Sequence, residues 1–221
     1  MAALSASVEE YLEAIHRLGG SAEGVSTTGL ARLLGVRPAS VTGMLRRLAD
    51  LGLITYRRYR DIALTEAGER SAHAVIRRHR LAERLLTDML GVPLDQAHDE
   101  ACRLEHAVSP ALEGRMAEAL GGPSACPHGH PIDAAAADHS IGLTEAPLNR
   151  QLAVARLDDE SPEVVRYLAG LGLLPGARLM VKLREPRDGA VVVEVAGVTR
   201  TLGPELAAGV RVTRPQRTRG T

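Results

Sequence analysis

The 221-residue sequence contains no phenylalanine, no tryptophan and only four tyrosines. Its hydrophobic cores must therefore be built from Leu, Val, Ile, Ala and Met. Lysine occurs once, as Lys182, so arginine carries nearly all of the positive charge. Apolar residues make up 45% and charged residues 24% of the chain. Such a composition is typical of a globular protein, and the length is sufficient for about two or three small domains.

The sequence also lacks long apolar runs and is poor in cysteine. No stretch of about 18 apolar residues is present, and MAALSASVEEYLEAI has no basic region followed by an apolar core. These absences predict neither a membrane span nor a signal peptide, and we expect a cytoplasmic protein. The two cysteines, Cys102 and Cys126, could pair. Without secretory context, however, a thiol beside His and Glu more often indicates metal binding or packing.

The net charge is zero, which argues against a surface uniformly coated with positive charge. One segment departs from this average. Residues 32–60 contain seven arginines against one acid, Asp50, which leaves a local net charge of +6. A compact basic patch on a neutral protein is the electrostatic pattern expected of contacts with nucleic-acid phosphates.

The N-terminal third has the pattern of a winged helix-turn-helix. Apolar residues recur at a helical period over residues 8–18, and a short helix then ends at Gly35. Pro38 stands at the first position of the next helix, which continues to Gly52. Two short alternating strands follow within residues 53–65 around a polar turn. Two short helices with a tight turn and a following hairpin form the winged variant of this motif.

We expect the second helix of this motif to enter the major groove of DNA. Small side chains at its N-terminal turn allow close approach, and Ala or Thr methyl groups can touch thymine methyls. The arginines and the wing would contact phosphates, which position a protein without reading sequence. The alternative is a helical hairpin with a solvated arginine-rich face. The predicted DNA-binding residues are Arg37, Pro38, Ala39, Ser40, Thr42, Arg46, Arg47, Tyr56, Arg57, Arg58 and Arg60.

The segment from position 79 to position 106 concentrates potential metal ligands. One pair stands four residues apart, at positions 79 and 83. A second set follows at positions 98, 102, 105 and 106, which are offsets of zero, four, seven and eight from the first of them. On a helix that turns ~100° per residue, the second set falls within an arc of roughly 100°. Imidazole, carboxylate and thiolate on one helix face indicate a divalent transition-metal site. The alternative is a pair of amphipathic helices with polar faces. The candidate ligands are His79, Glu83, His98, Cys102, Glu105 and His106.

These ligands divide into two sites, and each is incomplete on its own helices. The first site would use His79, Glu83 and His98. The second site would use Cys102, Glu105 and His106. Nitrogen and carboxylate oxygen donors suit manganese, iron or zinc. Acids elsewhere could complete the sites: Glu10 and Glu13 of the first helix, and those of DDESPE at 158–163.

The C-terminal part has a different character. Residues 121–147 are rich in Gly, Pro and Ala and have no period, so they are interpreted as a loop and linker. From about residue 148, β-branched runs alternate with Gly and Pro, with one helix at SPEVVRYLAGLG. This pattern predicts about five short strands in a small closed barrel.

Several motifs together resemble the diphtheria-toxin-repressor (DtxR/MntR) family over almost the whole chain. They are VEEYLEAI, PASVTGMLRRL, YRRYRDIALTEAG, CPHGHPI and, most specifically, the pair RHRLAERLL and HDEACRLEH. The resemblance implies an α+β protein of three domains. These are a winged helix-turn-helix at 1–72, an all-α dimerisation and metal-binding domain at 73–140, and an SH3-like (FeoA-like) β-barrel at 147–214.

The resemblance also implies a function. Members of this family are homodimeric repressors, not enzymes, that bind palindromic operators when loaded with ferrous iron or manganese and release DNA without metal. We therefore expect a cytoplasmic repressor that controls metal-uptake genes. Its expected partners are double-stranded DNA and a second copy of itself, without a membrane.

The family's ligands can be carried over to matching positions. His79, Glu83 and His98 match one family site, which iron-type members complete with an E-x-x-Q pair in the third domain. The nearest match here is Glu160 with Glu163, one register off.

The second family site is matched by Cys102, Glu105 and His106, with its remaining ligand at Glu10. Iron-type members have methionine at the place of Glu10, and manganese-type members have an acid. Cys102 departs from the glutamate common in manganese-type members, while Glu13 matches a further acidic ligand of that type. A carboxylate in place of a thioether favours Mn²⁺ over Fe²⁺, although the cysteine partly opposes this. Zn²⁺ and Co²⁺ should bind in vitro.

The remaining histidines and Cys126 receive structural interpretations. We expect Cys126, His128 and His130 of CPHGHP to be structural, because they lie in a Gly/Pro loop, and His16 and His73 to lie at a surface or interface.

Two other functions stay open. One is a metal-dependent hydrolase with Glu83 or Glu105 as general base, for which no H-E-x-x-H pattern exists. The other is a DNA-binding regulator that needs no metal.

Overall fold

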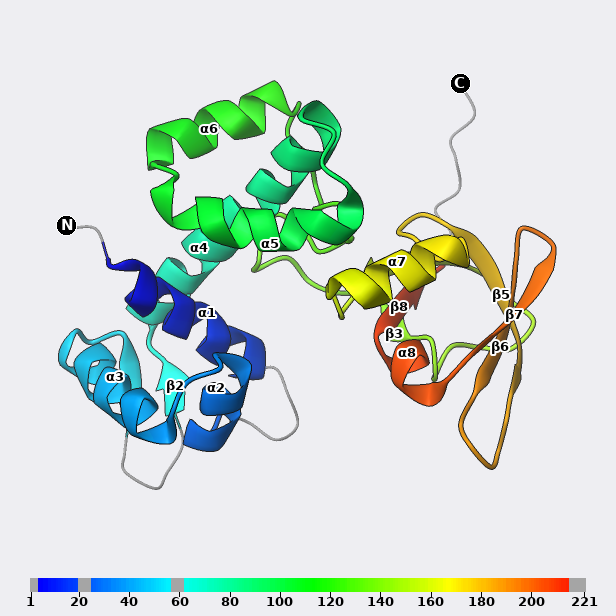
Figure 1. Cartoon of the computed structure of the whole chain (residues 1–221), viewed down its shortest axis with the longest axis horizontal. Coiled ribbons are helices and arrows are strands. Elements are labelled where there is room, and N and C mark those ends of the chain that lie inside the picture. Colours follow the sequence, from blue (N-terminus) through cyan, green and yellow to red (C-terminus); the bar gives the residue numbers. More distant parts are fainter. Residues whose placement is uncertain (1–3, 20–24, 57–61, 215–221) are drawn as a thin grey trace. The chain divides into compact units, whose positions relative to one another are not determined.

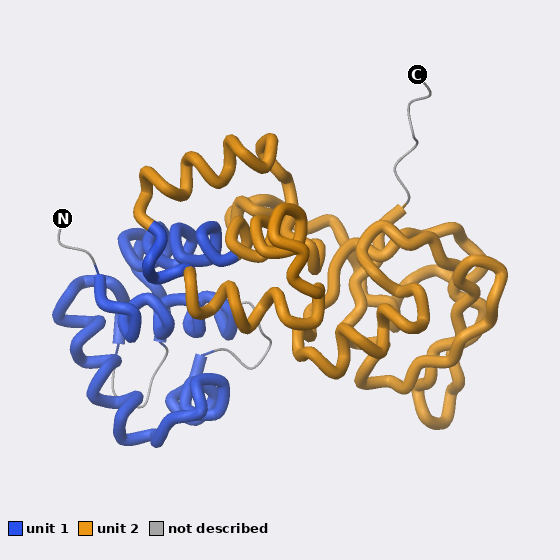
Figure 2. Tube along the Cα trace, turned by 45° about the horizontal axis from the view of Figure 1, so that its top comes forward, with its two compact units in different colours: residues 1–79, 105–108 blue, residues 80–104, 109–221 orange. Residues whose placement is uncertain are grey.

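The computed structural model describes residues 4–19, 25–56 and 62–214 (Figure 1). These residues form two compact units, which Figure 2 colours separately. Unit 1 consists of Met1–His79 and Glu105–Val108, and unit 2 of Arg80–Leu104 and Ser109–Thr221. None of the helices in the described ranges is long and apolar enough to cross a membrane.

Unit 1 contains the winged helix-turn-helix that the sequence predicts. Ser26 caps the second helix, because its Oγ accepts a hydrogen bond from Gly29 N at 3.0 Å. Gly35 adopts a φ of +63° in the turn, and Pro38 takes the first helical position, where no N–H is needed. The elements are α1 (Ala6–Gly19), α2 (Thr27–Leu33), α3 (Pro38–Asp50) and the antiparallel strands β1 (Ile54–Tyr56) and β2 (Ile62–Leu64).

Aliphatic side chains from these elements make the core of unit 1. Leu12 and Ile15 of α1 pack with Leu30 of α2, and Leu45 and Leu48 of α3 complete the cluster; all five are fully buried. Burial of each such side chain stabilises the fold by about 1.5–3 kcal/mol. The core therefore fixes α3 without any Phe or Trp, and leaves the opposite face of α3 exposed.

The central helices depart from the expected continuous form at two places. Helix α4 (Glu66–Arg84) ends in a π-helical turn at Leu85–Met89, and α5 (Leu94–Leu104) ends in a 3₁₀ turn at Glu105–Ala107. Helical periodicity in the sequence predicts one continuous helix over about residues 66–90 and another from Pro93 to about Val108. Thr87 sits in the first irregular segment and donates its hydroxyl to Glu83 O at 3.0 Å. Because both irregular turns adjoin candidate ligands, the backbone changes course where the ligands must converge.

Helix α6 (Pro110–Ala119) follows, and the Gly/Pro-rich segment after it is anchored to α4. Arg84 Nε donates to Ala125 O at 2.8 Å, and Arg80 Nη1 donates to Pro131 O at 2.5 Å. Ala125 and Pro131 also pair as an isolated antiparallel bridge. The segment is a loop, as predicted, but it is bound at both ends of its CPHGHP sequence.

The C-terminal part of unit 2 is an antiparallel sheet in the order β3-β8-β4-β5-β6-β7. It has six strands where the sequence predicted five, because the two-residue β3 is too short to leave a pattern. Helix α7 contributes Leu168 to the core of the sheet, and α8 contributes Ala207. The elements are β3 (Ile141–Gly142), β4 (Gln151–Leu157), α7 (Pro162–Gly170), β5 (Arg178–Arg184), β6 (Val191–Val195), β7 (Val198–Leu202), α8 (Pro204–Ala208) and β8 (Val210–Thr213).

Gly68 provides a test of the packing in unit 1. A Cβ at this position would lie 2.0 Å from Leu53 O and 3.0 Å from Leu53 C. We expect Gly68→Ala to lower the free energy of unfolding by about 1–3 kcal/mol, because helix α4 would have to move away from that backbone. Urea denaturation followed by circular dichroism measures the change.

The matched control is Gly114→Ala in α6. A Cβ there meets nothing within 4 Å. This substitution should raise the free energy of unfolding by up to about 1 kcal/mol, because alanine has the higher helix propensity. Equal stability of the Gly68→Ala and parent proteins would contradict the close approach.

Candidate metal centres and DNA-binding surface

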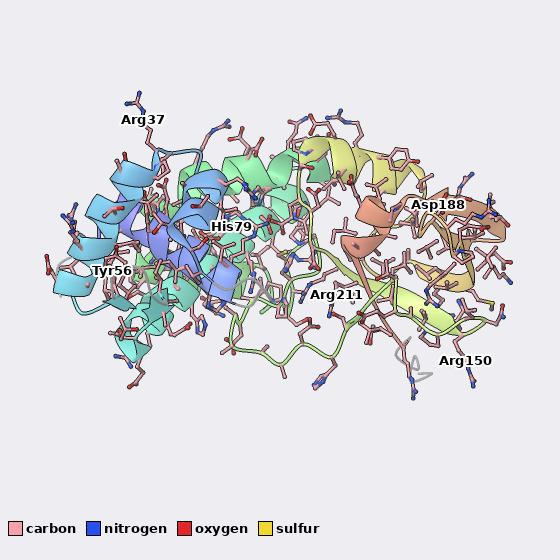
Figure 3. The ribbon with its side chains drawn as sticks, turned by 90° about the horizontal axis from the view of Figure 1, so that it is seen from below. Arg37, Tyr56, His79, Arg150, Asp188 and Arg211 are labelled. Atoms are coloured by element: carbon pink, nitrogen blue, oxygen red, sulfur yellow. The ribbon has the colours of Figure 1, made fainter. Side chains whose placement is uncertain are left out.

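The predicted DNA-reading turn lies at the exposed start of α3. Pro38, Ala39 and Ser40 are exposed, and Thr42 is half-buried with its hydroxyl bonded to Pro38 O at 3.1 Å. Arg37 is the N-cap residue and points away from the protein in Figure 3. The start of α3 thus combines small exposed side chains with an exposed guanidinium and the positive end of a helix.

The other predicted DNA contacts are placed in part. Arg46 and Arg47 are exposed on α3, and Tyr56 is half-buried at the end of β1. The wing residues Arg57, Arg58 and Arg60 lie outside the described residues. The predicted DNA contacts that the structure describes therefore lie on α3, at its N-cap and at the end of β1.

The first candidate metal centre lies inside unit 1, around the buried Glu105. Glu105 is 3% exposed; its Oε2 lies 2.6 Å from His79 Nδ1 and its Oε1 lies 3.3 Å from His106 Nε2. Glu10 Oε1 lies 4.0 Å from the same His106 nitrogen. The 3₁₀ turn after α5 thus directs its carboxylate and imidazole toward the first helix.

Glu9 orients this centre, although the sequence analysis did not select it. Its Oε2 accepts from His106 Nδ1 at 2.8 Å, and its Oε1 accepts from Arg78 Nη2 at 2.7 Å. A histidine that donates one ring N–H to a carboxylate presents its other nitrogen as a ligand. His106 Nε2 therefore faces Glu10 and Glu105. Glu13 is half-buried further along α1.

The second candidate centre lies inside unit 2, around two carboxylates that share imidazole partners. Glu83 is fully buried, and its Oε1 lies 3.0 Å from His128 Nδ1 and 3.6 Å from His98 Nδ1. Glu160 Oε2 lies 2.9 Å from His98 Nδ1, and Glu160 Oε1 lies 3.2 Å from His130 Nε2. Two acids and three histidines from four separate segments thus meet.

The CPHGHP loop reaches this centre by a close backbone approach to β4. Gly129 has a φ of +94°, and a Cβ there would lie 2.1 Å from Ala155 O. His128 O accepts from Leu157 N at 2.9 Å. His128 Nε2 donates to Leu94 O at 3.2 Å, which leaves Nδ1 directed at Glu83. The glycine and these hydrogen bonds fix the buried imidazole beside the carboxylate.

Two overlapping ligand sets exist at this centre. Glu83, Cys126, His128 and Glu160 each offer one ligand atom, and these atoms lie within 4.8 Å of one another. The same holds for His98 together with the two carboxylates. Glu163 is exposed on α7 and belongs to neither set.

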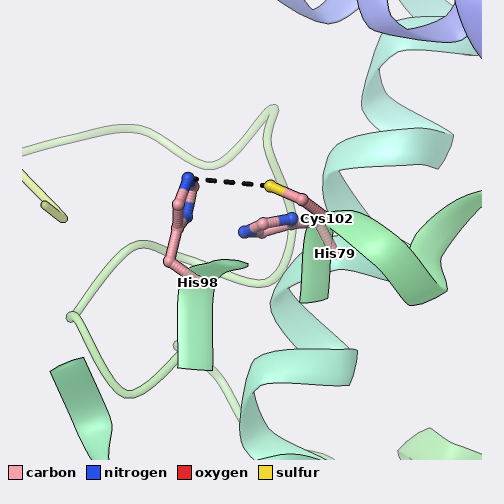
Figure 4. Close-up of side chains that lie close together, drawn as sticks. All are labelled: His79, His98 and Cys102. Atoms are coloured by element: carbon pink, nitrogen blue, oxygen red, sulfur yellow. Dashed lines mark hydrogen bonds between the residues drawn. The ribbon is translucent and has the colours of Figure 1, made fainter. Parts of the chain in front are cut away.

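Cys102 is an exposed residue of α5. Its Sγ lies 3.7 Å from His98 Nε2, as the dashed line in Figure 4 marks. The structure thus pairs this thiol with His98, whereas the sequence analysis grouped it with Glu105 and His106.

The protons in this centre compensate the two buried carboxylates. Burial alone would lower the pKa of His98, but hydrogen bonds with Cys102, Glu160 and Glu83 outweigh it and raise the pKa to about 12. Burial would likewise lower the pKa of His128, yet its hydrogen bond to Glu83 raises it. Burial raises the pKa of Glu160, but hydrogen bonds from His130 and His98 bring it well below the usual range.

The donor set fits a divalent cation. Burial, and then the charges of Glu83 and Glu160, raise the pKa of the Cys126 thiol well above its usual value. Hydrogen bonds from imidazole groups thus keep the pKa of Glu160 low, while burial and the two carboxylates keep that of Cys126 high. A divalent ion supplies the positive charge that these protons supply, in a site with oxygen, nitrogen and sulfur donors.

The sequence analysis expected Cys126 and His128 to be structural, and it did not select Glu9; the structure brings the first two beside Glu83 and places Glu9 beside His106. CPHGHP did offer a signal, because one Cys and two His within five residues is dense in ligand types. Because CPHGHP lies more than 40 residues from Glu83 in the sequence, the pattern did not indicate that His128 would contact Glu83. The adjacent Glu9 and Glu10 offered no signal that would separate an orienting acid from a ligand.

Family models match three consecutive parts of the chain. Residues 3–62 match the iron-dependent repressor N-terminal DNA-binding domain, and residues 65–134 match the iron-dependent repressor metal-binding and dimerisation domain. Residues 141–214 match the FeoA domain. The iron-dependent repressor IdeR of Mycobacterium leprae is 33% identical over 225 residues, which cover 93% of this chain and 96% of that relative. The chain belongs to the iron-dependent repressor family.

Solved structures support the assignment of this repressor to the family. A manganese-dependent transcriptional repressor in complex with manganese is 35% identical and superposes with a TM-score of 0.87 over 94% of this chain and 99% of that one. The ScaR structure with bound Zn²⁺ is 28% identical, with a TM-score of 0.82 over 94% and 99% of the two chains. The predicted family, fold class and metal-dependent repressor function are confirmed, and the matched relatives are transcriptional repressors rather than enzymes.

The protonation of the unit 2 centre predicts how metal binding by this repressor depends on pH. His98, with a pKa raised to about 12, and the Cys126 thiol, with its raised pKa, both hold protons at neutral pH. These protons must leave before nitrogen and sulfur can coordinate, so metal binding should release protons and metal affinity should rise with pH. Calorimetric titration with Mn²⁺ in buffers of different ionisation enthalpy measures the number released. A metal affinity that stays constant between about pH 6 and 8 would contradict this protonation scheme.

Proposed function

We propose that this repressor is a homodimer that binds a palindromic operator when its two metal centres are loaded, and that it thereby controls metal-uptake genes. The observation that carries the proposal is the pair of carboxylate-centred clusters, each built from segments distant in sequence. The match to a dimerisation domain at 65–134 and the match to a DNA-binding domain at 3–62 support a dimer on DNA. A dimer's recognition helices would reach half-sites about 34–36 Å apart.

The unit 1 centre suggests how metal controls DNA binding. Glu10 lies on α1, which packs in the core that positions α3, whereas Glu105 and His106 follow directly after α5. Ligation by these three residues would join the helix-turn-helix to the segment between α5 and α6. Without it, Glu9 alone among these acids is within 3 Å of His106. Metal and DNA affinities would then be linked reciprocally, by about 1–3 kcal/mol.

For the unit 2 centre we propose Glu83, Cys126, His128 and Glu160 as the ligands, with His98 beside them. The family resemblance favours His79, Glu83 and His98 instead, completed by Glu160 and Glu163. Burial favours the first set, because His128 is fully buried and Cys126 is 1% exposed, whereas the side chain of His98 is 26% exposed and Glu163 is exposed. Ligands with fixed positions lose less conformational entropy on binding than exposed, mobile ones.

For the physiological metal we propose Mn²⁺ ahead of Fe²⁺. The unit 1 centre offers the carboxylates Glu10 and Glu105 and one imidazole, and hard oxygen donors suit Mn²⁺. A manganese-bound repressor is among the similar structures, while IdeR is named for iron. The thiol of Cys126 favours softer ions at the unit 2 centre, so the two centres would differ in selectivity.

The two cysteines test the ligand assignment. Thiolate coordination of Co²⁺ gives a strong sulfur-to-cobalt charge-transfer absorption, which oxygen and nitrogen ligands do not give. We expect Co²⁺ titration of the parent protein to produce this band, Cys126→Ser to abolish it, and the matched control Cys102→Ser to retain it. Loss of the band in Cys102→Ser alone would overturn the assignment of Cys126 and favour Cys102 as the thiolate ligand, as in the second site of the family resemblance.

Operator binding tests the regulatory proposal. Retardation of promoter DNA, measured against matched titrations of Mn²⁺, Fe²⁺ and Zn²⁺, should show binding that requires metal. Glu10→Ala should require on the order of tenfold more Mn²⁺ for half-maximal binding, because one ligand is lost. Glu118→Ala, an exposed acid on α6, is the control and should leave the titration unchanged. Operator binding that persists in excess chelator would instead support a regulator without metal.

A further inference from the structure

Unit 1 contains a third group of potential ligands, which neither metal centre uses. His16 is in the last turn of α1, and Glu69 and His73 lie one turn apart near the start of α4. Glu69 Oε2 lies 3.0 Å from His16 Nδ1 and 3.4 Å from His73 Nε2. One ligand atom from each of the three residues lies within 4.8 Å of the others. The sequence analysis expected these histidines only at a surface or interface.

The separations match those of ligands around one metal ion. With metal–ligand bonds of about 2.0–2.2 Å in a tetrahedron, neighbouring ligand atoms stand roughly 3.2–3.6 Å apart. The two distances to Glu69 lie close to this range. The imidazole rings stand edge to face, with centroids 4.8 Å apart and an interplanar angle of 89°. Two imidazole nitrogens thus converge on one carboxylate oxygen without the rings blocking each other.

The site is also accessible. The side chains of His16, Glu69 and His73 are 29%, 45% and 30% exposed. This exposure allows an ion to enter from solvent and leaves room for water as a fourth ligand, as in three-ligand zinc sites. An ion pair at such exposure contributes little to stability by itself. Ion pairing therefore offers little reason for one carboxylate oxygen to face two imidazoles.

We propose that His16, Glu69 and His73 form a third divalent-metal site of the two-histidine, one-carboxylate type, which binds zinc more tightly than manganese or iron. Imidazole with carboxylate and no thiolate suits zinc, and zinc exceeds manganese and iron in the general order of affinities. The site joins the end of α1 to the start of α4, the helices that precede and follow the α2–α3 helix-turn-helix and its hairpin in the chain. The proposal is independent of the proposed function, because that function uses none of these residues.

Zinc bound here would stabilise unit 1. A ligand that binds the folded state and not the unfolded state raises the thermal midpoint of unfolding as its concentration increases. The full-length variant His16→Gln/His73→Gln removes both imidazoles and keeps polar side chains of similar length. The matched control is His139→Gln, an exposed histidine in the 133–140 segment.

The experiment measures zinc content and thermal stability on the same proteins. Equilibrium dialysis against Zn²⁺ with elemental analysis should show one equivalent per chain fewer in the double variant than in the parent and in His139→Gln. The zinc-induced rise in thermal midpoint should also be smaller in the double variant. Equal midpoints in chelator would show that the variant folds normally. An unchanged zinc count in the double variant would overturn the proposal.

A second variant and a direct signal guard against a misfolded protein. Glu69→Gln, which is isosteric, should lose the same single equivalent. In the ¹⁵N-labelled parent protein, Zn²⁺ should shift the ring-nitrogen resonances of His16 and His73, and resonances that stay in place would count against the site. Mn²⁺-dependent operator binding should persist in all of these variants. A parent that takes up the zinc equivalent but fails to bind operator would contradict the proposed function alone.

Discussion

The structure of unit 2 depends on the buried carboxylate of Glu83 and the partly buried carboxylate of Glu160 beside it, which need a compensating positive charge. Glu83 is fully buried, and Glu160 lies close enough to share His98 and His128 with it. Leaving a buried charge without compensation costs about 3–5 kcal/mol. In the metal-free protein the imidazolium groups supply the compensation, and a divalent ion supplies it when bound. The folding of the CPHGHP loop against β4 and the chemistry of the candidate unit 2 centre therefore rest on one electrostatic requirement.

The candidate ligands of the two centres differ in how deeply they are buried. In unit 2 the acids and the thiol are almost fully buried, and the metal would complete the interior of the unit. In unit 1 the side chain of Glu10 is 54% exposed, so its ligation costs conformational entropy that only a bound cation offsets. A site that forms only with metal is suited to sensing, whereas a site already assembled is suited to stabilising the protein. In the proposed function the regulatory step would therefore lie at the unit 1 centre, where a bound cation would have to draw in Glu10.

Much of the fold could be predicted from the sequence, because its signals are local. Pro38 after Gly35 marks a helix-turn-helix, and helical periodicity located the central helices. The π turn after Glu83 and the 3₁₀ turn at Glu105 could not be predicted, since tertiary contacts and not local propensity decide them. Nor could β3, whose two residues gain their place only by pairing with β8.

The residues of the candidate sites also fall into two groups, those that local sequence patterns identify and those that only the fold brings together. His79, Glu83, His98, Glu105 and His106 stand at helical offsets, so a periodic search finds them. Cys126 and His128 reach Glu83 through a glycine that only the folded backbone explains, and Glu9 differs from Glu10 only in which neighbour it faces. The His16, Glu69 and His73 group combines both cases. Its α4 pair has a helical offset, but its third member becomes visible only when α1 and α4 are packed together. Candidate ligands within one helix can therefore be predicted from the sequence. A candidate ligand contributed by a separate element can be identified only from the folded structure.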